Sequence, residues 1–472
     1  MKIKRVSVNN LFDAFSYAID FKEHNPISII HAPNGYGKTT VFRIMKAILD
    51  MNFGDIITVP FSGFLIEFTD EYTIMVEQTI TNAVAMHRLS VNEVTYSIYK
   101  KEKCVVELNL PPLQSFYDYA SEEGIEDAVR RFEMRRRHVP AEERERADQI
   151  NLGKMFQKYK ETMEEIRRKI SVQFIDANRL YAPTNIENGG MSEKRRLYRG
   201  ENYLRDENGR IVASRRDMTS FVGGTNEKIV IDANDIFEQI QRVRQRYSLE
   251  SEKQDRDFPD RLVSFVESSR DDFYSDEEIA EKLKMLEEKR QELENAGLAL
   301  AGKKSLAPTK DIDETMRKFY TLYIDDTFKK LSLYDDIKKK LELFIEIINK
   351  KTAFSNKVMC IDNERGIVFE PINSTSGKKR AIPLSKLSSG EKHDFILFYE
   401  LIFKSNSNSV FLIDEPEISL HVAWQMEFIS VLEKICESNN MQAIVATHSP
   451  DIVNGHDDLL ISLDMEEDSD GI

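Results

Sequence analysis

The segment HAPNGYGKTT, residues 31–40, decides the fold because it nearly matches the phosphate-binding pattern G-x-x-x-x-G-K-[ST]. Ala32 stands where that pattern begins with glycine. A residue that precedes proline is restricted to extended backbone conformations, which alanine adopts without strain. The sharp turns are left to Asn34, Gly35 and Gly37, residue types that tolerate positive φ. We therefore interpret the segment as a working phosphate-binding loop.

The residues on either side of the loop support this interpretation. Residues 26–30 (PISII) are a short apolar stretch typical of a buried strand, and residues 39–51 carry apolar side chains at helical spacing. In a strand–loop–helix unit, backbone N–H groups at the helix N-terminus cradle phosphates. Lys38 is expected to reach the β- and γ-phosphate oxygens, and Thr39 to hold Mg²⁺. The expected nucleotide-binding residues of this loop are Asn34, Gly35, Gly37, Lys38, Thr39 and Thr40.

The composition is that of an ordinary globular protein. The 472 residues allow two or three domains, and 41% of them are apolar and 31% charged. A net charge of −15 excludes a surface built throughout to coat nucleic acid, so any such contact must be a local patch. The three cysteines form no C-x-x-C pair, which argues against a zinc site and for a reducing compartment. Because the sequence shows neither an apolar signal segment nor a membrane-length apolar run, it predicts a cytoplasmic protein without a membrane partner.

Three regions differ in character along the chain. Residues 1–117 alternate like strands and indicate an N-terminal lobe around the phosphate-binding loop. Residues 118–352 are predicted to be an inserted helical and short coiled-coil region, with a mobile basic loop near 185–228. Residues 353–472 return to the strands and helices of an α/β core. The predicted fold class is α/β, with a mixed and parallel sheet assembled from N- and C-terminal segments around the insert.

One helix is marked at both ends. Ser275 and Glu278 form a capping box, and Gly297 is a stop signal. Between them, residues at heptad-like spacing predict a narrow seam that packs on one partner helix. About 22 residues at ~1.5 Å each make an arm of about 33 Å, which is short for a coiled coil. The seam residues are Ile279, Leu283, Leu286 and Leu293.

The second half of the predicted site lies about 350 residues further along the chain. LSSGE (387–391) precedes a helix with buried-type positions. SVFLID (409–414) and QAIVAT (442–447) are continuous apolar runs, as expected of parallel strands buried on both faces. Because open α/β sheets bind ligands at the carboxyl ends of their strands, the polar residues after these runs are candidate site residues.

The residue types at these strand ends suit phosphoryl transfer. Asp414 is expected to hold Mg²⁺, and Glu415 to orient and deprotonate the attacking water. His448 is expected to hydrogen-bond the γ-phosphate, and Ser389 and Gly390 to offer donors at a helix N-terminus. By itself, an acidic strand end is as readily structural as functional, and a single histidine is more often structural. The order in which the four motifs occur favours the functional interpretation.

The ordered set A-x-x-x-x-G-K-T, L-S-S-G-E, F-L-I-D-E-P-E-I-S-L-H and A-T-H-S-P resembles ABC-type ATPases of the SMC/RecF/OLD class. The resemblance covers residues 1–115 and 355–460. It implies ATP and Mg²⁺ as ligands and an ATP-sandwich dimer, or a higher homo-oligomer, in which Ser389 and Gly390 bind the γ-phosphate of ATP held by the opposite subunit. EISLH (417–421) resembles the D-loop of that interface. Gln173 is the candidate for the Q-loop glutamine at the metal.

The short helical arm and the sequences of the four motifs are most similar to the ATPase subunits of anti-phage defence systems of the PARIS type. Systems of the Septu type are the next most similar. That resemblance implies a sensor and scaffold subunit that holds and then releases a separate nuclease effector when a phage trigger protein is sensed. Because 24 residues follow His448, we expect no Toprim-like nuclease domain after it. The alternative is a RecF-like DNA-repair clamp. The basic clusters at 130–138 and 194–199 suit phosphate contact, although solvated helix or loop faces are the commoner explanation of such clusters.

Overall fold

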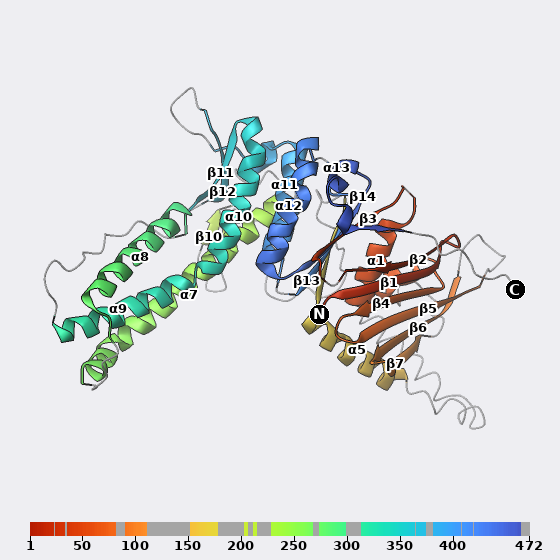
Figure 1. The fold of residues 1–472 in the computed structure, drawn as a ribbon, viewed down its shortest axis with the longest axis horizontal. Helices are drawn as coiled ribbons and strands as arrows, with labels where there is room; N and C mark the ends of the chain where they lie inside the picture. Colours follow the sequence, from red (N-terminus) through yellow and green to blue (C-terminus); the bar gives the residue numbers. More distant parts are fainter. Residues whose placement is uncertain are drawn as a thin grey trace. The chain divides into compact units, whose positions relative to one another are not determined.

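The computed structural model describes residues 1–22, 24–33, 35–81, 90–110, 152–177, 203–205, 211–214, 228–267, 273–298, 313–363, 365–373, 381–406, 408–418 and 420–463. The chain forms two compact units (Figure 1). Unit 1 joins the two ends of the chain, Met1–Asn178 and Lys404–Ile472, and unit 2 is Arg179–Phe403. Residues 353–403, which the sequence analysis assigned to the C-terminal lobe, belong to unit 2.

An antiparallel sheet of six strands forms one layer of unit 1 (Figure 1). Its core-facing residues alternate with half-buried ones, as in β4, where Phe64, Ile66 and Phe68 are buried. Helix α5 (Leu152–Lys169) packs along β7 and adds Tyr159 to the same core. In sheet order the strands are β2 (Phe15–Asp20), β1 (Ile3–Leu11), β4 (Gly63–Phe68), β5 (Tyr72–Thr81), β6 (Ser90–Lys100) and β7 (Lys103–Leu110).

A parallel sheet of five strands forms the second layer of unit 1. Its central strands β13 and β14 are buried at every position, which confirms the prediction drawn from their continuous apolar runs. Each neighbouring pair of strands is parallel, so their carboxyl ends meet at one edge. The α/β fold class predicted from the sequence is therefore confirmed. In sheet order the strands are β15 (Leu460–Ser462), β3 (Ile27–His31), β14 (Gln442–Thr447), β13 (Ser409–Asp414) and β8 (Ser171–Ile175).

Helix α1 (Lys38–Asp50) buries its apolar side in the core that both sheets share. Its Phe42 lies edge-on to Phe174 of β8, with ring centroids 6.3 Å apart. The spacing of apolar residues that predicted this helix thus also fixes the helix on the parallel sheet. Among the described residues of unit 1, the remaining helices are α2 (Phe53–Ile57), α12 (Val422–Asn439), α13 (Pro450–Val453) and the 3₁₀ turn η4 (Asp457–Leu459).

A single buried amide joins the two sheets. Oε1 of Gln442, the first residue of β14, accepts from the backbone N–H of Ile3 at 2.9 Å. Its Nε2 donates to the carbonyl of Ile3 at 3.0 Å. Both backbone groups of Ile3 are therefore satisfied by a side chain 439 residues away.

Unit 2 contains a set of long helices. Helix α8 (Asp276–Asn295) has the predicted capping box, Gly297 follows it at φ +68°, and the four seam residues are buried. The 40-residue helix α7 (Lys228–Glu267) is longer, and the sequence analysis did not single it out. The other elements in the described part of unit 2 are α9 (Glu314–Ser332), α10 (Asp335–Thr352), η2 (Ala353–Ser355), η3 (Leu384–Lys386), α11 (Ser389–Phe403), and the strand pairs β9 (Tyr203–Arg205) with β10 (Ile211–Ser214) and β11 (Lys357–Asp362) with β12 (Gly366–Pro371).

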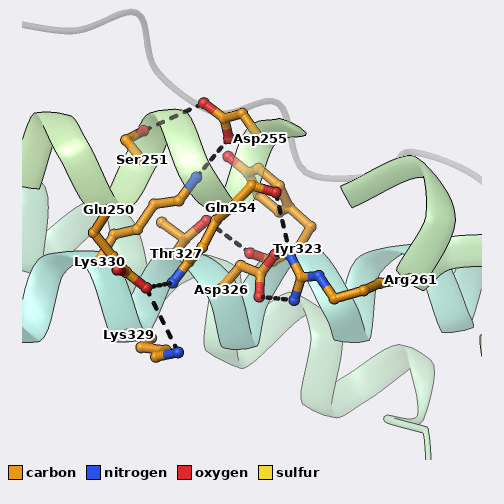
Figure 2. A network of polar contacts seen from close by, with 10 residues as sticks. All are labelled: Glu250, Ser251, Gln254, Asp255, Arg261, Tyr323, Asp326, Thr327, Lys329 and Lys330. Atoms are coloured by element: carbon orange, nitrogen blue, oxygen red, sulfur yellow. Dashed lines mark hydrogen bonds and ion pairs between the residues drawn. The ribbon is translucent and has the colours of Figure 1, made fainter. Parts of the chain in front are cut away.

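A polar network holds α7 to α9 around a proline (Figure 2). Pro259 lies inside α7 and removes one backbone N–H donor from that helix. Arg261 donates to the carbonyl of Gln254 at 3.3 Å and to both oxygens of Asp326 in α9, at 2.8 and 2.5 Å. On the other side of the proline, Lys330 of α9 pairs with Asp255 at 2.6 Å. These contacts tie the two helices together where α7 lacks a backbone hydrogen bond.

Several sequence predictions lie outside the described residues. They include the basic clusters at 130–138 and 194–199, the boundary near residue 117, and most of the basic loop at 185–228. In the part of the chain that the structure describes, no helix combines the length and the apolar character needed to cross a membrane.

Replacing Gln442 with leucine is expected to destabilise unit 1. The change leaves the buried N–H and C=O of Ile3 without partners, so the free energy of unfolding should fall by about 2–4 kcal/mol. The measurement is urea unfolding followed by the fluorescence of Trp424, the single tryptophan, which lies in unit 1.

The control is Gln157→Leu on the exposed face of α5, where the free energy of unfolding should change by less than about 0.5 kcal/mol. Equal effects of the two substitutions would show that the Gln442 amide does not hold the sheets together.

Candidate functional site

The phosphate-binding loop connects β3 to α1 and turns on two glycines. Gly35 has φ +87° and Gly37, the N-cap of α1, has φ +79°, conformations that disfavour other residues. A Cβ at position 37 would lie 2.8 Å from Cδ2 of Leu11. Ala32 is buried at the end of β3, whereas Asn34 lies outside the described residues. The two glycines expected at the turns therefore have the positive φ values that the loop requires.

Two aromatic residues of β2 contact the phosphate-binding loop at Tyr36. The hydroxyl of Tyr17 donates to the carbonyl of Tyr36 at 2.9 Å, and burial raises the pKa of Tyr17 to about 12. The ring of Phe15 packs on the ring of Tyr36 with centroids 5.5 Å apart. The sequence analysis missed this support, because a strand residue and a loop residue 19 positions apart carry no local motif.

Lys38 reaches across the loop to the end of β14. Its ammonium donates to the carbonyls of Ala32 at 2.7 Å and Pro33 at 3.2 Å, and lies 2.8 Å from Nε2 of His448. Burial lowers the pKa of Lys38. Nearby carboxylates oppose this shift, and Glu415 has the largest opposing effect. Lys38 and His448, two predicted site residues that lie 410 positions apart in the sequence, are thus in direct contact.

Thr39 and Asp414 form the second contact between the distant segments. The threonine hydroxyl donates to Oδ2 of Asp414 at 2.8 Å. Burial raises the pKa of Asp414 to about 6; the bond from Thr39 opposes this shift, and the charge of Glu415 adds to it. Among the described residues, no hydrogen-bond donor reaches Oδ1 of Asp414, although this oxygen is buried. A buried, unpaired carboxylate oxygen beside a hydroxyl is the kind of donor set that fits Mg²⁺.

Few protein ligands surround this position. In the described part of the chain, no group of three or more His, Cys, Asp or Glu side chains forms a metal site. Mg²⁺ in nucleotide sites is usually held by one or two protein groups together with phosphates and water. Thr39 and Asp414 would hold such an ion.

Glu415 has a strained backbone. Its φ of +44° lies in the left-handed region, which is unfavourable for a residue with a Cβ. The N–H of Glu415 donates to the carbonyl of Ala446 in β14 at 2.9 Å, so the strain is held by the neighbouring strand. Such backbone outliers cluster at functional sites. Its carboxylate Oε1 lies 3.5 Å from Nε2 of His448, whose pKa is lowered by burial and by the charge of Lys38.

Gln173, the predicted metal ligand, lies within β8 rather than at its end. It pairs in register with Phe411, and its amide donates to Ser171 Oγ at 3.3 Å. Ile175 pairs with Ile413, so the β8 residue level with Asp414 is Asp176. Arg43 of α1 pairs with Asp176 at 2.8 Å. A role of Gln173 at the metal stays a prediction, and Asp176 lies closer to the strand end where such a ligand is needed.

Ser389 and Gly390, the residues expected to bind a phosphate held by the opposite subunit, belong to unit 2. Ser389 and Gly390 begin α11, directly after Ser388, whose N–H and hydroxyl form a capping box with Glu391. The carboxylate of Glu391 also accepts from Lys357 of β11 at 2.8 Å. This pairing fixes the first turn of α11. The backbone N–H groups of that turn lie at the helix N-terminus, where a phosphate can accept from them.

Glu417 is the third acid of the segment DEPE (414–417), and the sequence analysis placed it only at the start of the D-loop-like segment EISLH, without a role at this site. Its carboxylate accepts three hydrogen bonds from the segment 447–449. The signal was a third acid three positions after Asp414, but only the folded chain shows which donors it faces.

At the carboxyl edge of the parallel sheet, unit 1 therefore brings five predicted residues together: Lys38, Thr39, Asp414, Glu415 and His448. A glycine loop at a helix N-terminus, a lysine, a buried acid and a second acid define a nucleoside triphosphate-binding protein of the α/β class.

Comparison with known proteins agrees with this class. The family described as AAA ATPase domain matches residues 1–453, nearly the whole chain, and the chain belongs to this family. A curated relative, the Retron Ec83 probable ATPase of Escherichia coli, is 26% identical over 182 residues. The match covers 34% of this chain and 33% of the relative, so the chain spans about a third of the relative's length.

Two solved structures of Smc heads are similar to the chain at low scores. One is the Smc head domain with an extended coiled coil bound to the C-terminal domain of ScpA, from Pyrococcus furiosus, at 11% identity and a TM-score of 0.30. The other is the SmcHead bound to the C-winged helix domain of ScpA, at 10% identity and a TM-score of 0.33. Each comparison covers 98% of this chain and 94% of the other. These TM-scores are too low to bear on the site or the function.

Asp414→Asn is expected to stabilise the protein in the absence of Mg²⁺. The folded-state pKa of about 6 lies above the ordinary value of 3.8, so wild-type stability falls as pH rises from about 4 to about 6. The asparagine variant lacks this penalty, and above pH 7 its free energy of unfolding should exceed that of the wild type by up to about 3 kcal/mol. Urea unfolding followed by Trp424 fluorescence at several pH values measures the difference.

The same variant should lose Mg²⁺-dependent nucleotide binding, because the carboxylate is needed at the metal. A variant that is less stable than the wild type at pH 7.5, or a stability difference that does not change with pH, would contradict the assignment of a desolvated carboxyl to Asp414.

Proposed function

We propose that the chain binds and hydrolyses ATP with Mg²⁺ at the edge of the parallel sheet in unit 1. The observation that carries this proposal is the hydrogen bond of 2.8 Å from Thr39 to Asp414, which joins the end of the phosphate-binding loop to the strand-end acid. The family of AAA ATPase domains supports the same activity.

Each residue has a distinct task in the proposed reaction. The loop N–H groups and Lys38 bind the phosphates, and Lys38 must first release the carbonyls of Ala32 and Pro33. Glu415 orients the attacking water and accepts its proton, and His448 contacts the γ-phosphate through its ring. Bound Mg²⁺ neutralises charge on the phosphate oxygens. Most of the rate enhancement then comes from positioning and charge stabilisation.

We further propose that two copies close on ATP. Ser389 and Gly390 at the start of α11 present donors suited to a phosphate held by the opposite subunit, as the resemblance to the SMC/RecF/OLD class implies. The dimer is a prediction that the following experiment also tests.

Glu415→Gln is expected to lower kcat for ATP by roughly 10²–10⁴-fold, because glutamine positions the water but cannot accept its proton. ATP binding should remain within about threefold of the wild type, since Glu415 does not hold the phosphates. With ATP and Mg²⁺ the variant should accumulate as a dimer, measured by size-exclusion chromatography with light scattering, and turnover is measured by phosphate release.

Three companion variants separate the steps. Lys38→Ala should lose ATP binding altogether, whereas Glu437→Gln on the exposed face of α12 should behave as the wild type. Ser389→Arg in the Glu415→Gln background should bind ATP without dimerising. Undiminished turnover by Glu415→Gln would remove Glu415 as the base.

For the cell, we propose the role of a sensor and scaffold subunit in an anti-phage defence complex with a separate nuclease effector. The similarity to a retron ATPase supports a defence context, and the PARIS-type or Septu-type assignment stays a prediction. The alternative is a RecF-like clamp that binds DNA with ATP through the basic clusters at 130–138 and 194–199.

Phage challenge of cells that express the chain with its neighbouring genes tests the defence role. Protection that disappears in the Lys38→Ala variant, together with a nuclease that co-purifies with the wild type, is the expected result. Binding of the purified chain to duplex DNA with a steep salt dependence, without protection of cells, would favour the clamp.

A further inference from the structure

The segment 447–449, which carries His448, has an anchor of its own. Oε1 of Glu417 accepts from the hydroxyl of Thr447 at 2.8 Å, from the N–H of His448 at 2.8 Å and from the N–H of Ser449 at 3.2 Å. Thr447 is fully buried and Ser449 nearly so, which leaves these donors little access to water. One carboxylate oxygen therefore accepts from three donors of the turn after β14, and the N–H of Ser449 also donates to Thr447 Oγ1 at 3.0 Å.

A second contact joins the same two segments. The hydroxyl of Ser449 donates to Oε1 of Gln425 at 2.5 Å, and Nε2 of Gln425 donates to the carbonyl of Leu420 at 3.0 Å. The carbonyl of Glu417 in turn accepts from the N–H of Leu420 at 2.9 Å. The turn after β14 is thus bonded to the segment 417–425 at two points.

The ring of His448 has contacts of its own, separate from those of its backbone. Its Nε2 lies 2.8 Å from the ammonium of Lys38 and 3.5 Å from Oε1 of Glu415. When Lys38 moves to bound phosphates, this contact with the ring is released, while the backbone of His448 keeps its bond to Glu417. An anchored backbone with a released ring is the arrangement needed to aim the imidazole at a new acceptor.

We propose that Glu417 is a positioning residue of the ATPase, which holds the backbone of His448 so that the ring meets the γ-phosphate. This inference rests on the proposed function. Glu417 reaches His448 through its bonding oxygen, which the turn 447–449 takes up, and its charge also acts on Lys38. Its second oxygen, Oε2, is buried and has no hydrogen-bond partner among the described residues, so a neutral amide fits the same place.

Two variants of Glu417 and one control test the role. Glu417→Ala removes the acceptor, Glu417→Gln keeps one oxygen for the three donors, and Glu437→Ala removes an exposed carboxyl of the same unit. Thermal unfolding of unit 1, followed by Trp424, establishes that each variant is folded before activity is compared.

The first measurement needs no nucleotide. Amide hydrogen exchange at His448 should be about tenfold faster in Glu417→Ala, since an opened hydrogen bond of average strength is worth about that factor. The N–H of Ser449 keeps Thr447 Oγ1 as an acceptor at 3.0 Å and should change less. Glu417→Gln should stay within about threefold of the wild type. Unchanged exchange in the alanine variant would overturn the inference whatever the chain does with ATP.

The second measurement is steady-state ATP hydrolysis with separate determination of ATP affinity. Glu417→Ala should lose about 30–100-fold in kcat with the Kd for ATP unchanged, and Glu417→Gln should recover most of that loss. A parallel loss of affinity and stability, or a glutamine variant as slow as the alanine variant, would overturn the positioning role. A wild type without ATPase activity would instead refute the proposed function, and the exchange result would remain interpretable.

Discussion

The parallel pairing of β3 with β14, and of β14 with β13, is the constraint on which the site in unit 1 depends. β3 delivers the phosphate-binding loop, whereas β13 and β14 deliver Asp414 and His448 from the other end of the chain. Because parallel strands end at one edge, residues 375 positions apart come within 2.8 Å of each other. Helix α1 packs in the core shared by both sheets, so its N-terminus is fixed where the phosphates would bind.

The site is assembled at a cost in electrostatic free energy. Asp414 is almost fully buried with one oxygen unpaired, and burial also lowers the pKa of Lys38. Glu415 adds a strained backbone. The unpaired carboxylate oxygen and the desolvated ammonium are the features that a ligand carrying metal and phosphate together would relieve, as the proposed function requires.

Local patterns predicted what depends on neighbouring residues. The positive φ of Gly35 and Gly37, the buried strand before Asp414 and the capping box of α8 were all visible in the sequence. Contacts between distant side chains were not: no spacing rule connects Gln442 to Ile3 or Glu417 to His448. Helix α7 was missed because Pro259 and its charged surface obscure a 40-residue helix that α9 stabilises. The sequence was sufficient to identify the acids and the loop of the site, but not the distant side chains that orient them.

The most direct test is a double-mutant cycle on the magnesium dependence of ATP binding, measured by calorimetry with Thr39→Val, Asp414→Asn and the double variant. If the two ends of the chain form one site, each single substitution removes most of the affinity gained from Mg²⁺, and the double variant loses little more. Independent losses that add in the double variant would contradict a shared magnesium–nucleotide site.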